Sequence, residues 1–192
     1  MITQQDLDRI LGLLPNVTLS VSDKIYLCSL FESITLNKDD FFVNEKKIVD
    51  RVGFVISGSL RKYTENPNGG RDVIQLIVAN CFFTDLERYY MDLSSQIHIQ
   101  ATTTCRLLTI RISDLKKLRE MNMKFNDIIH QFAEMIVYKR TKIDRQLDGG
   151  TATERYHHFN SLYPDWDKSF LVCDVASRLN MSHANLCLIR KK

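Results

Sequence analysis

The stretch that most constrains how this chain folds is a long segment without glycine or proline, residues 125–147. Its large apolar residues recur at steps of three and four, which places them in one stripe along a single face of an α-helix. A helix of this length would be roughly 35 Å long, about the span of a small domain. The stripe consists of Phe125, Ile129, Phe132, Ile136, Ile143 and Leu147.

Two arrangements suit such a helix. It could lie in the core of one domain, or it could connect two modules and share its apolar face with a second copy of the chain. We favour the connecting helix, because the chain has a different character on its two sides. We therefore expect a homodimer. Its contacts would come from Phe125, Ile129, Phe132, Ile136 and Ile143.

Composition is that of an ordinary globular protein. With 192 residues, 44% of them hydrophobic and 26% charged, the chain can bury the core of one large domain or of a large and a small one. A net charge of +3 neither requires nor excludes nucleic acid. Basic residues nevertheless gather at 139–145 and 190–192.

The same sequence predicts a cytoplasmic protein that makes no membrane contact. Its first residues lack the pattern of a signal peptide, and no apolar run is long enough to cross a bilayer. The five cysteines are dispersed and include no CxxC pair. That usage fits reduced thiols, and it predicts neither disulfides nor a bound metal or other cofactor.

Residues 40–112 change from helical spacing to short β-branched and aromatic runs. Gly58 and the sequence Asn68-Gly69-Gly70 provide turn signals between them. Two short helices are expected before this region, the second of them capped by Ser22. Short strands with tight turns, flanked by helices, predict a small β-barrel or roll. The runs are 41–43, 52–56, 60–63, 73–78, 97–101 and 106–112.

The last twenty or so residues have the pattern of two short helices that cross closely. Ala176 is small and lies on the inner face of the first helix, and Asn180 tolerates the positive φ of a tight turn. Ser182 can cap the second helix, whose Leu186 points inward. This arrangement indicates a helix-turn-helix, although an ordinary helical hairpin would show a similar pattern.

Three stretches together resemble the Crp/Fnr family of bacterial transcription regulators. They are GFVISGSLRKY around Gly58, IQATTTCRLLTIRISDLKKL before the long helix, and ATERYHHF followed by VASRLNMSHANLCLIRKK. The resemblance covers essentially the whole chain. It implies an α+β fold in which a double-stranded β-helix or jelly roll of the cyclic-nucleotide-binding type is followed by a long dimerisation helix and a small helix-turn-helix domain.

The implied domains are a sensor roll with flanking helices at 1–120, a dimerisation helix at 121–148 and a DNA-binding domain at 149–192 with a reduced wing. The chain departs from the family in the phosphate-binding cassette. Family members place a Gly-Glu pair and an Arg-Ser pair around the cyclic phosphate and ribose. Here Thr84-Asp85 and Ser95-Gln96 stand near those positions, so the arginine fork is missing.

We therefore predict that the roll does not bind cyclic AMP. It is expected either to sense another small molecule, through an apolar pocket near Phe82, Phe83, Tyr89 and Tyr90, or to sense none. Those aromatic residues are more often core than ligand contacts. The candidate effector residues are Phe82, Phe83, Thr84, Asp85, Arg88, Ser95 and Gln96.

The resemblance also implies which residues meet DNA. His183 or Asn185 could pair with a base edge, and the terminal basic residues could hold phosphates. Leu188 stands where the family would have an arginine, and it can only meet a thymine methyl or pack internally. The candidate DNA contacts are Ser182, His183, Asn185, Leu188, Arg190, Lys191 and Lys192.

An enzyme is not expected. The adjacent His157 and His158 diverge on a helix and make a poor metal pair, and no nucleophile motif or phosphate-binding loop is present. The remaining alternative is a ligand-sensing or protein-interaction dimer whose helix-turn-helix does not bind DNA. A gel shift that depends on salt concentration would separate the two functions.

Overall fold

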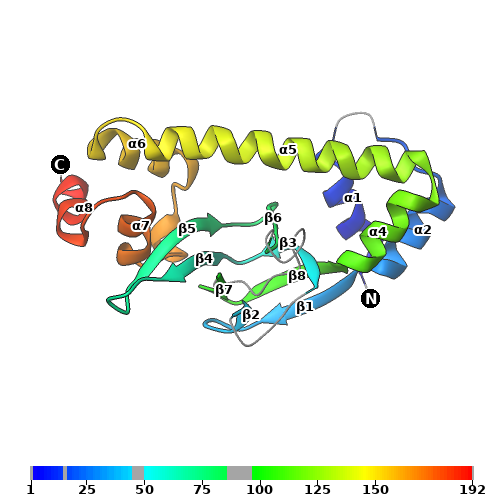
Figure 1. Cartoon of the computed structure of the whole chain (residues 1–192), viewed down its shortest axis with the longest axis horizontal. Coiled ribbons are helices and arrows are strands. Elements are labelled where there is room, and N and C mark those ends of the chain that lie inside the picture. Colours follow the sequence, from blue (N-terminus) through cyan, green and yellow to red (C-terminus); the bar gives the residue numbers. More distant parts are fainter. Residues whose placement is uncertain (1, 15–16, 45–49, 86–96, 192) are drawn as a thin grey trace.

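The structure is a computed structural model, and it describes residues 2–14, 17–44, 50–85 and 97–191. A long helix, α5 (Met123–Asp148), lies along one side of a β-roll. Figure 1 shows α1, α2 and α4 gathered at one end of this helix and α6, α7 and α8 at the other. The roll lies between them, under the middle of α5.

Three helices lie at the N-terminal end, and side chains cap the first two of them but not the third. They are α1 (Gln4–Leu11), α2 (Val21–Leu30) and, after the strands, α4 (Ile112–Met121). The hydroxyls of Thr3 and Ser20 each accept the backbone N–H of the aspartate three residues on. The carboxylate of that aspartate in turn accepts the backbone N–H of the capping residue. Ser20 and not Ser22 is therefore the cap of α2, because only Ser20 has an aspartate, Asp23, at the third helical position.

The strands form two antiparallel sheets of the roll. One sheet has the order β1-β8-β3-β6 and the other β2-β7-β4-β5. The expected runs are all strands, but β1 and β6 were not among them. The strands are β1 (Glu32–Leu36), β2 (Phe41–Val43), β3 (Arg51–Ser57), β4 (Leu60–Glu65), β5 (Arg71–Ile77), β6 (Phe82–Phe83), β7 (His98–Ala101) and β8 (Cys105–Arg111).

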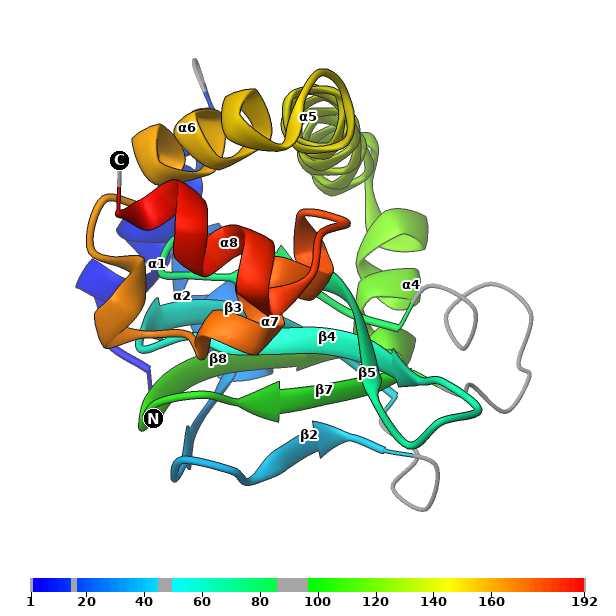
Figure 2. The same ribbon diagram turned by 90° about the vertical axis from the view of Figure 1, so that its left-hand side faces the viewer.

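Two turns form where the sequence predicted them. Gly58, between β3 and β4, has a φ of 87°, and a side chain there would collide with the backbone of Thr104 and Cys105. The β4–β5 hairpin turns at Asn66–Gly70, with Gly69 at a φ of 74°. This hairpin lies beneath α7, a placement that Figure 2 shows from the end of the molecule.

The C-terminal helices are α6 (Ala152–Leu162), the 3-10 turn η1 (Trp166–Lys168), α7 (Val172–Arg178) and α8 (His183–Arg190). We call α6 to α8 the C-terminal module. Gly150 takes a φ of 78° after α5, and Thr151 caps α6. In the part of the chain that the structure describes, every helix is too short or too polar to span a bilayer.

Apolar packing joins the C-terminal module to the roll. Leu147, Phe159 and Leu186 lie in one core cluster with Tyr63 and Val73 of the roll hairpin. Two further clusters fill the inside of the roll and the space between the roll and the N-terminal helices. The division of the chain into domains at residues 120 and 148 stays a prediction. The core cluster that contains Leu147 and Phe159 crosses the boundary at residue 148.

Candidate nucleic-acid interface and effector region

The corner between α7 and α8 has the geometry of a helix-turn-helix. Asn180 has a φ of 51°, and the Met181 N–H donates to the carbonyl of Ala176 at 3.0 Å. Ala176 is buried, so the two helices can approach closely there. The sequence predicted both the turn residue and the small inner residue.

Arg155 of α6 supports the turn in a way that the sequence did not predict. Its guanidinium donates to the carbonyls of Leu179, Gly150 and Asn180 at 2.8, 2.7 and 3.3 Å. It thereby satisfies carbonyls that the ends of α7 and α5 leave without helical partners. Only the position of Arg155 in the run ATERYHHF marked it, and that pattern says nothing of its partners.

The second helix, α8, has one buried face and one exposed face. Ser182 caps it by accepting the Asn185 N–H at 3.1 Å, and Leu186 is completely buried. The exposed face holds most of the predicted DNA contacts together. Ala184 lies between them and was missed, although its spacing of four from Leu188 places both on one face. The exposed residues are Ser182, His183, Ala184, Asn185, Leu188, Arg190 and Lys191.

Besides Ser182, two more of the predicted contacts have partners within the chain. The guanidinium of Arg190 lies 4.7 Å from the ring centre of the buried Trp166. The Sγ of Cys187 lies 3.8 Å from Nδ1 of His183, one turn earlier on α8. Leu188 is 62% exposed, so it does not pack internally. Lys192 lies outside the described residues.

The core beneath α8 is rich in aromatic side chains. Tyr163 packs beside Phe159 and Phe170, with ring centres 5.0 and 6.5 Å away. Burial raises the pKa of Tyr163 to about 12. The phenol therefore stays neutral at any pH the protein would meet, which suits a rigid support for the exposed helix.

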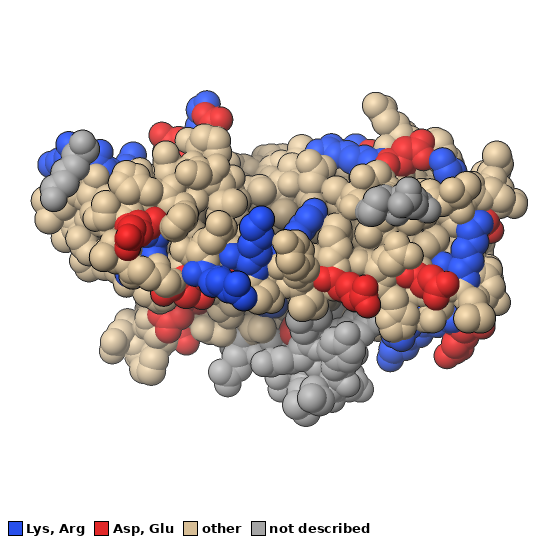
Figure 3. Space-filling view, turned by 90° about the horizontal axis from the view of Figure 1, so that it is seen from above, with Lys and Arg blue, Asp and Glu red and all other residues tan. Residues whose placement is uncertain are grey.

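Charges on the face formed by α5 and α6 are mixed. Figure 3 shows Lys and Arg interspersed with Asp and Glu across this face, with further basic side chains at the end that holds α8. Lys139, Lys142 and Arg145 of α5 are exposed, whereas Arg140 is held by Asp144 at 2.6 Å. Among the described residues of this face, Lys and Arg therefore form no continuous patch of the kind that could neutralise many phosphates at once.

The described part of the predicted effector region is occupied by packing. Phe82 lies between Phe54 of the roll and Phe132 of α5, at ring-centre distances of 4.8 and 5.2 Å. Phe83 is buried against Phe42 at 4.9 Å. These rings thus fill the core, which is the alternative that the sequence left open for them.

Polar groups next to these rings also have partners. The Thr84 hydroxyl donates to the carbonyl of Arg51 at 3.2 Å, and the Lys62 ammonium donates to the carbonyl of Thr84 at 3.1 Å. Asp85 is buried. The other predicted effector residues lie outside the described residues: Arg88, Tyr89, Tyr90, Ser95 and Gln96.

The predicted dimer stripe of α5 largely faces its own chain. Phe125 is 2% exposed, and its ring lies 6.4 Å from that of Tyr26 in α2. Ile129 and Phe132 border the same core, and Ile143 borders the core of the C-terminal module. Assigning this stripe to a partner copy is therefore wrong for Phe125, because α2 and the roll cover that face. Ile136 is partly buried.

The outward face of α5 presents a different set of residues. Met123, His130 and Val137 are exposed at intervals of seven, and Asn126 and Ala133 lie between them. Positions that repeat in this way stay on one side of a helix and suit a coiled-coil seam. These positions were not predicted, because the stripe of larger side chains is more prominent in the sequence.

Comparison with known proteins places this geometry in a known fold. Residues 33–122 match the cyclic nucleotide-binding domain. FixK2 from Bradyrhizobium japonicum aligns with a TM-score of 0.65 and 15% identity over 84% of this chain and 83% of that protein. CLP from Xanthomonas campestris, described as a c-di-GMP-responsive global regulator, aligns with a TM-score of 0.66 and 13% identity over 90% of each chain.

CooA from Carboxydothermus hydrogenoformans aligns with a TM-score of 0.60 and 13% identity over 86% of this chain and 77% of that one. No curated protein matches the sequence. The predicted α+β fold with a roll of the cyclic-nucleotide-binding type is thus confirmed, and the structural likeness supports the predicted resemblance.

Proposed function

We propose that this chain, which carries a cyclic nucleotide-binding domain at residues 33–122 within the Crp/Fnr fold, is a homodimeric transcription regulator that reads DNA with α8. The observation that supports it most is the presentation of α8. Leu186 anchors one face of this helix in the core, and the opposite face is exposed with His183 and Asn185 on it. A helix presented in this way fits the major groove.

The dimer would form along the outward face of α5. Met123 and Val137 are exposed there, and His130 occupies the same line halfway between them. Two copies related by a twofold axis would bring equivalent residues together and place both α8 helices on one duplex. Lys191 is exposed beyond α8 and is available for a phosphate contact.

The roll of this regulator does not bind cyclic AMP. Asp85 is buried, and the carbonyl of Thr84 already accepts the Lys62 ammonium. Ser95-Gln96 stands where the family has Arg-Ser, so the sequence lacks the arginine fork that would pair with a phosphate there. Titration calorimetry with cyclic AMP and cyclic GMP should give no heat, and a ligand hundredfold above its Kd would stabilise the fold by about 2.7 kcal/mol. Binding of either nucleotide would contradict this proposal.

Cyclic di-GMP belongs in the same titration because CLP is described as responsive to it. Heat with cyclic di-GMP alone would identify the class of effector. No heat with any of the three would direct the search to other small molecules.

A second candidate function is favoured by one observation. Leu188 is 62% exposed on the outward face of α8, and Ala184 lies beside it. An apolar centre suits contact with a protein better than contact with phosphates. In this case the chain would be an interaction dimer.

A substitution on α8 separates the two functions. If α8 enters the groove, Leu188→Arg adds a cation beside the duplex. We then expect tighter DNA binding, and the plot of log K against log salt should steepen by about one. The matched control is Leu162→Arg, at an exposed position of α6. Equal effects of both variants, or no gel shift at low salt, would favour the interaction dimer.

A further inference from the structure

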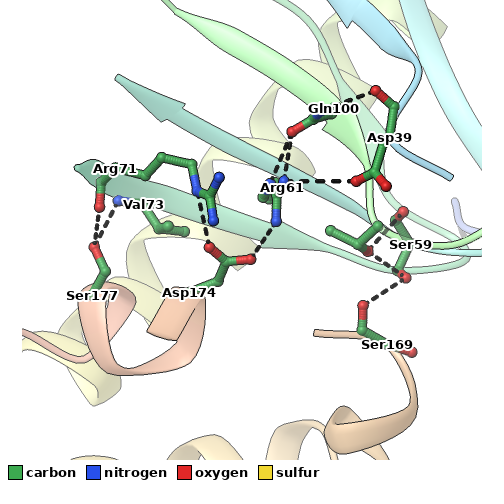
Figure 4. A network of polar contacts seen from close by, with 10 residues as sticks. Asp39, Ser59, Arg61, Arg71, Val73, Gln100, Ser169, Asp174 and Ser177 are labelled. Carbon is green, nitrogen blue, oxygen red and sulfur yellow. Dashed lines mark hydrogen bonds and ion pairs between the residues drawn. The ribbon is translucent and has the colours of Figure 1, made fainter. Parts of the chain in front are cut away.

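Helix α7 caps the free edge of the roll. Strand β5 is an edge strand, since the sheet order is β2-β7-β4-β5. The Ser177 hydroxyl of α7 accepts the Val73 N–H and donates to the Arg71 carbonyl, both at 2.9 Å. Figure 4 shows this serine bridging the two backbone groups. One side chain thus satisfies edge groups that another strand would otherwise pair.

Beside this cap, a carboxylate of α7 enters a site that the roll has built. The Arg61 guanidinium donates to Asp174 at 2.6 Å, and Arg71 donates to its other oxygen at 3.3 Å. The side chains of Arg61 and Asp174 are only 5% and 2% exposed. We call Arg61, Arg71 and Gln100 the arginine socket.

The roll orients the socket without help from α7. Gln100 accepts two bonds from Arg61, at 3.1 and 2.6 Å, and donates to the Asp39 carbonyl at 2.9 Å. Both guanidinium groups also lie within 6 Å of the Tyr63 ring centre. Figure 4 shows Gln100 and Asp174 on opposite sides of Arg61. The socket is therefore preorganised to accept a carboxylate.

One turn after Asp174, α7 also forms ion pairs with α5. Arg178 is buried and donates to Asp144 at 2.5 Å and to Asp148 at 2.7 Å. Asp144 in turn accepts a bond from Arg140, which donates to the Ile74 carbonyl of β5 at 2.7 Å. Charged groups thus link the roll, α5 and α7 in a closed ring. Asp174 and Arg178 are the two members on α7.

Buried ion pairs of this kind contribute little net stability compared with apolar packing, but removing one partner is costly and the bonds are directional. Their effect is therefore mainly on orientation. Because α8 follows α7 by a short turn, fixing α7 against both the roll and α5 also fixes α8.

We propose that Asp174 and Arg178 are positioning residues for DNA recognition, and that the arginine socket is where the roll controls the placement of α8. The positioning role rests on the function proposed above. The docking of α7 in the socket does not. Any change that moves β5 relative to α5 would act on α7 through these two residues.

The Val73 amide is a direct probe of docking, because its partner is on α7. In Asp174→Asn the two cations of the socket lose their buried carboxylate, and the nearest one left is the exposed Asp39, 3.9 Å from Arg61. We expect the Val73 amide to exchange at least about tenfold faster in the full-length protein, with amides inside the β4–β7 ladder unchanged. Asp174→Glu should restore much of the protection. The matched control, Asp165→Asn, breaks the exposed pair with Lys168 and should change nothing.

DNA affinity measured on the same variants tests the positioning role. Asp174→Asn should weaken binding to a selected operator by at least about tenfold, and binding to random DNA should stay the same, because only the placement of α8 changes. If Asp174→Asn does not fold, Ser177→Ala, which removes only the two edge bonds, should still speed Val73 exchange.

Unchanged Val73 exchange in both variants would overturn docking through α7. Faster exchange with unchanged operator affinity would overturn the positioning role. If the wild-type protein binds no DNA while exchange changes as expected, the proposed function fails and the docking in the socket stands.

Discussion

The two halves of α5 are attached to the rest of the molecule by different forces. The first half is held by apolar packing: Phe125 and Ile128 are buried, and Phe132 meets Phe82. The second half is held largely by charges, through Arg140 and Asp144, and Leu147 is its one buried apolar residue. Apolar contacts are strong but non-directional, whereas paired guanidinium groups impose a geometry.

The difference indicates a division of labour along one helix. The half beside the roll is fixed in place by burial. The half beside the C-terminal module is oriented by ion pairs, which can be altered without disrupting the packing of a core. Substitutions in the two halves should therefore affect stability and orientation to different degrees.

The largest effect is expected in the first half. Phe125→Ala removes a ring from a filled core and should lower the free energy of unfolding by about 3–5 kcal/mol. Urea denaturation measures it. The control Gln131→Ala, at an exposed position of α5 outside the proposed seam, should change stability by less than about 0.5 kcal/mol. Similar small losses in both variants would break the comparison.

A smaller loss is expected from the charged half. Arg178→Met keeps the bulk of the side chain but leaves Asp144 and Asp148 without their buried partner. Because both aspartates keep some access to water, we expect a loss of about 2 kcal/mol in the free energy of unfolding. Arg145→Met, at an exposed position of α5, is the control. A loss as large as that of Phe125→Ala would mean that charges also hold the helix in place.

The outward face of α5 should show its effect on assembly and not on folding. Val137→Asp places a charge in the proposed seam and should raise the dimer dissociation constant about tenfold or more, equivalent to about 1.4 kcal/mol. Sedimentation equilibrium measures this constant. Gln131→Asp carries the same charge change at an exposed position outside that face. A dimer that tolerates both substitutions would have its seam elsewhere.

The smallest effect concerns one ion pair near the apolar half. Arg106 donates two bonds to Asp6 and lowers the pKa of that carboxyl from 3.8 to about 2. The folded carboxylate keeps its charge to lower pH than the unfolded one. The pair therefore stabilises the fold above about pH 4, and the contribution is lost as pH falls toward 2.

Since Arg106 is 39% exposed, the contribution should be on the order of 1 kcal/mol. It is read from the difference in unfolding free energy between wild type and Asp6→Asn across that pH range. A difference that does not depend on pH would show that Asp6 acts by packing alone.

Features set by neighbouring residues were predictable from the sequence. Gly58, Asn180 and Ser182 adopt the expected turn and cap conformations, because each depends on a few adjacent residues. The cap of α2 was assigned two residues late, since two serines fit the spacing and only the reciprocal bond from Asp23 distinguishes them.

Contacts between distant segments were not predictable. Asp174 meets Arg61 across 113 residues of sequence, and nothing in either neighbourhood marks the other. The stripe of α5 was found, but which neighbour covers it depends on where α2 and the roll lie. The exposed heptad positions of α5 could be recognised only after α2 and the roll were seen to cover its apolar stripe.

We propose that two α8 helices, placed by α5 and the roll, read one duplex together. The most direct measurement is selection of binding sites from random duplex DNA with the wild-type protein, followed by sequencing of the bound fraction. We expect an inverted repeat whose half-site centres are one helical turn apart, about 34–36 Å, or a multiple of it. Enrichment of no sequence, or of a single half-site bound by a monomer, would contradict the claim.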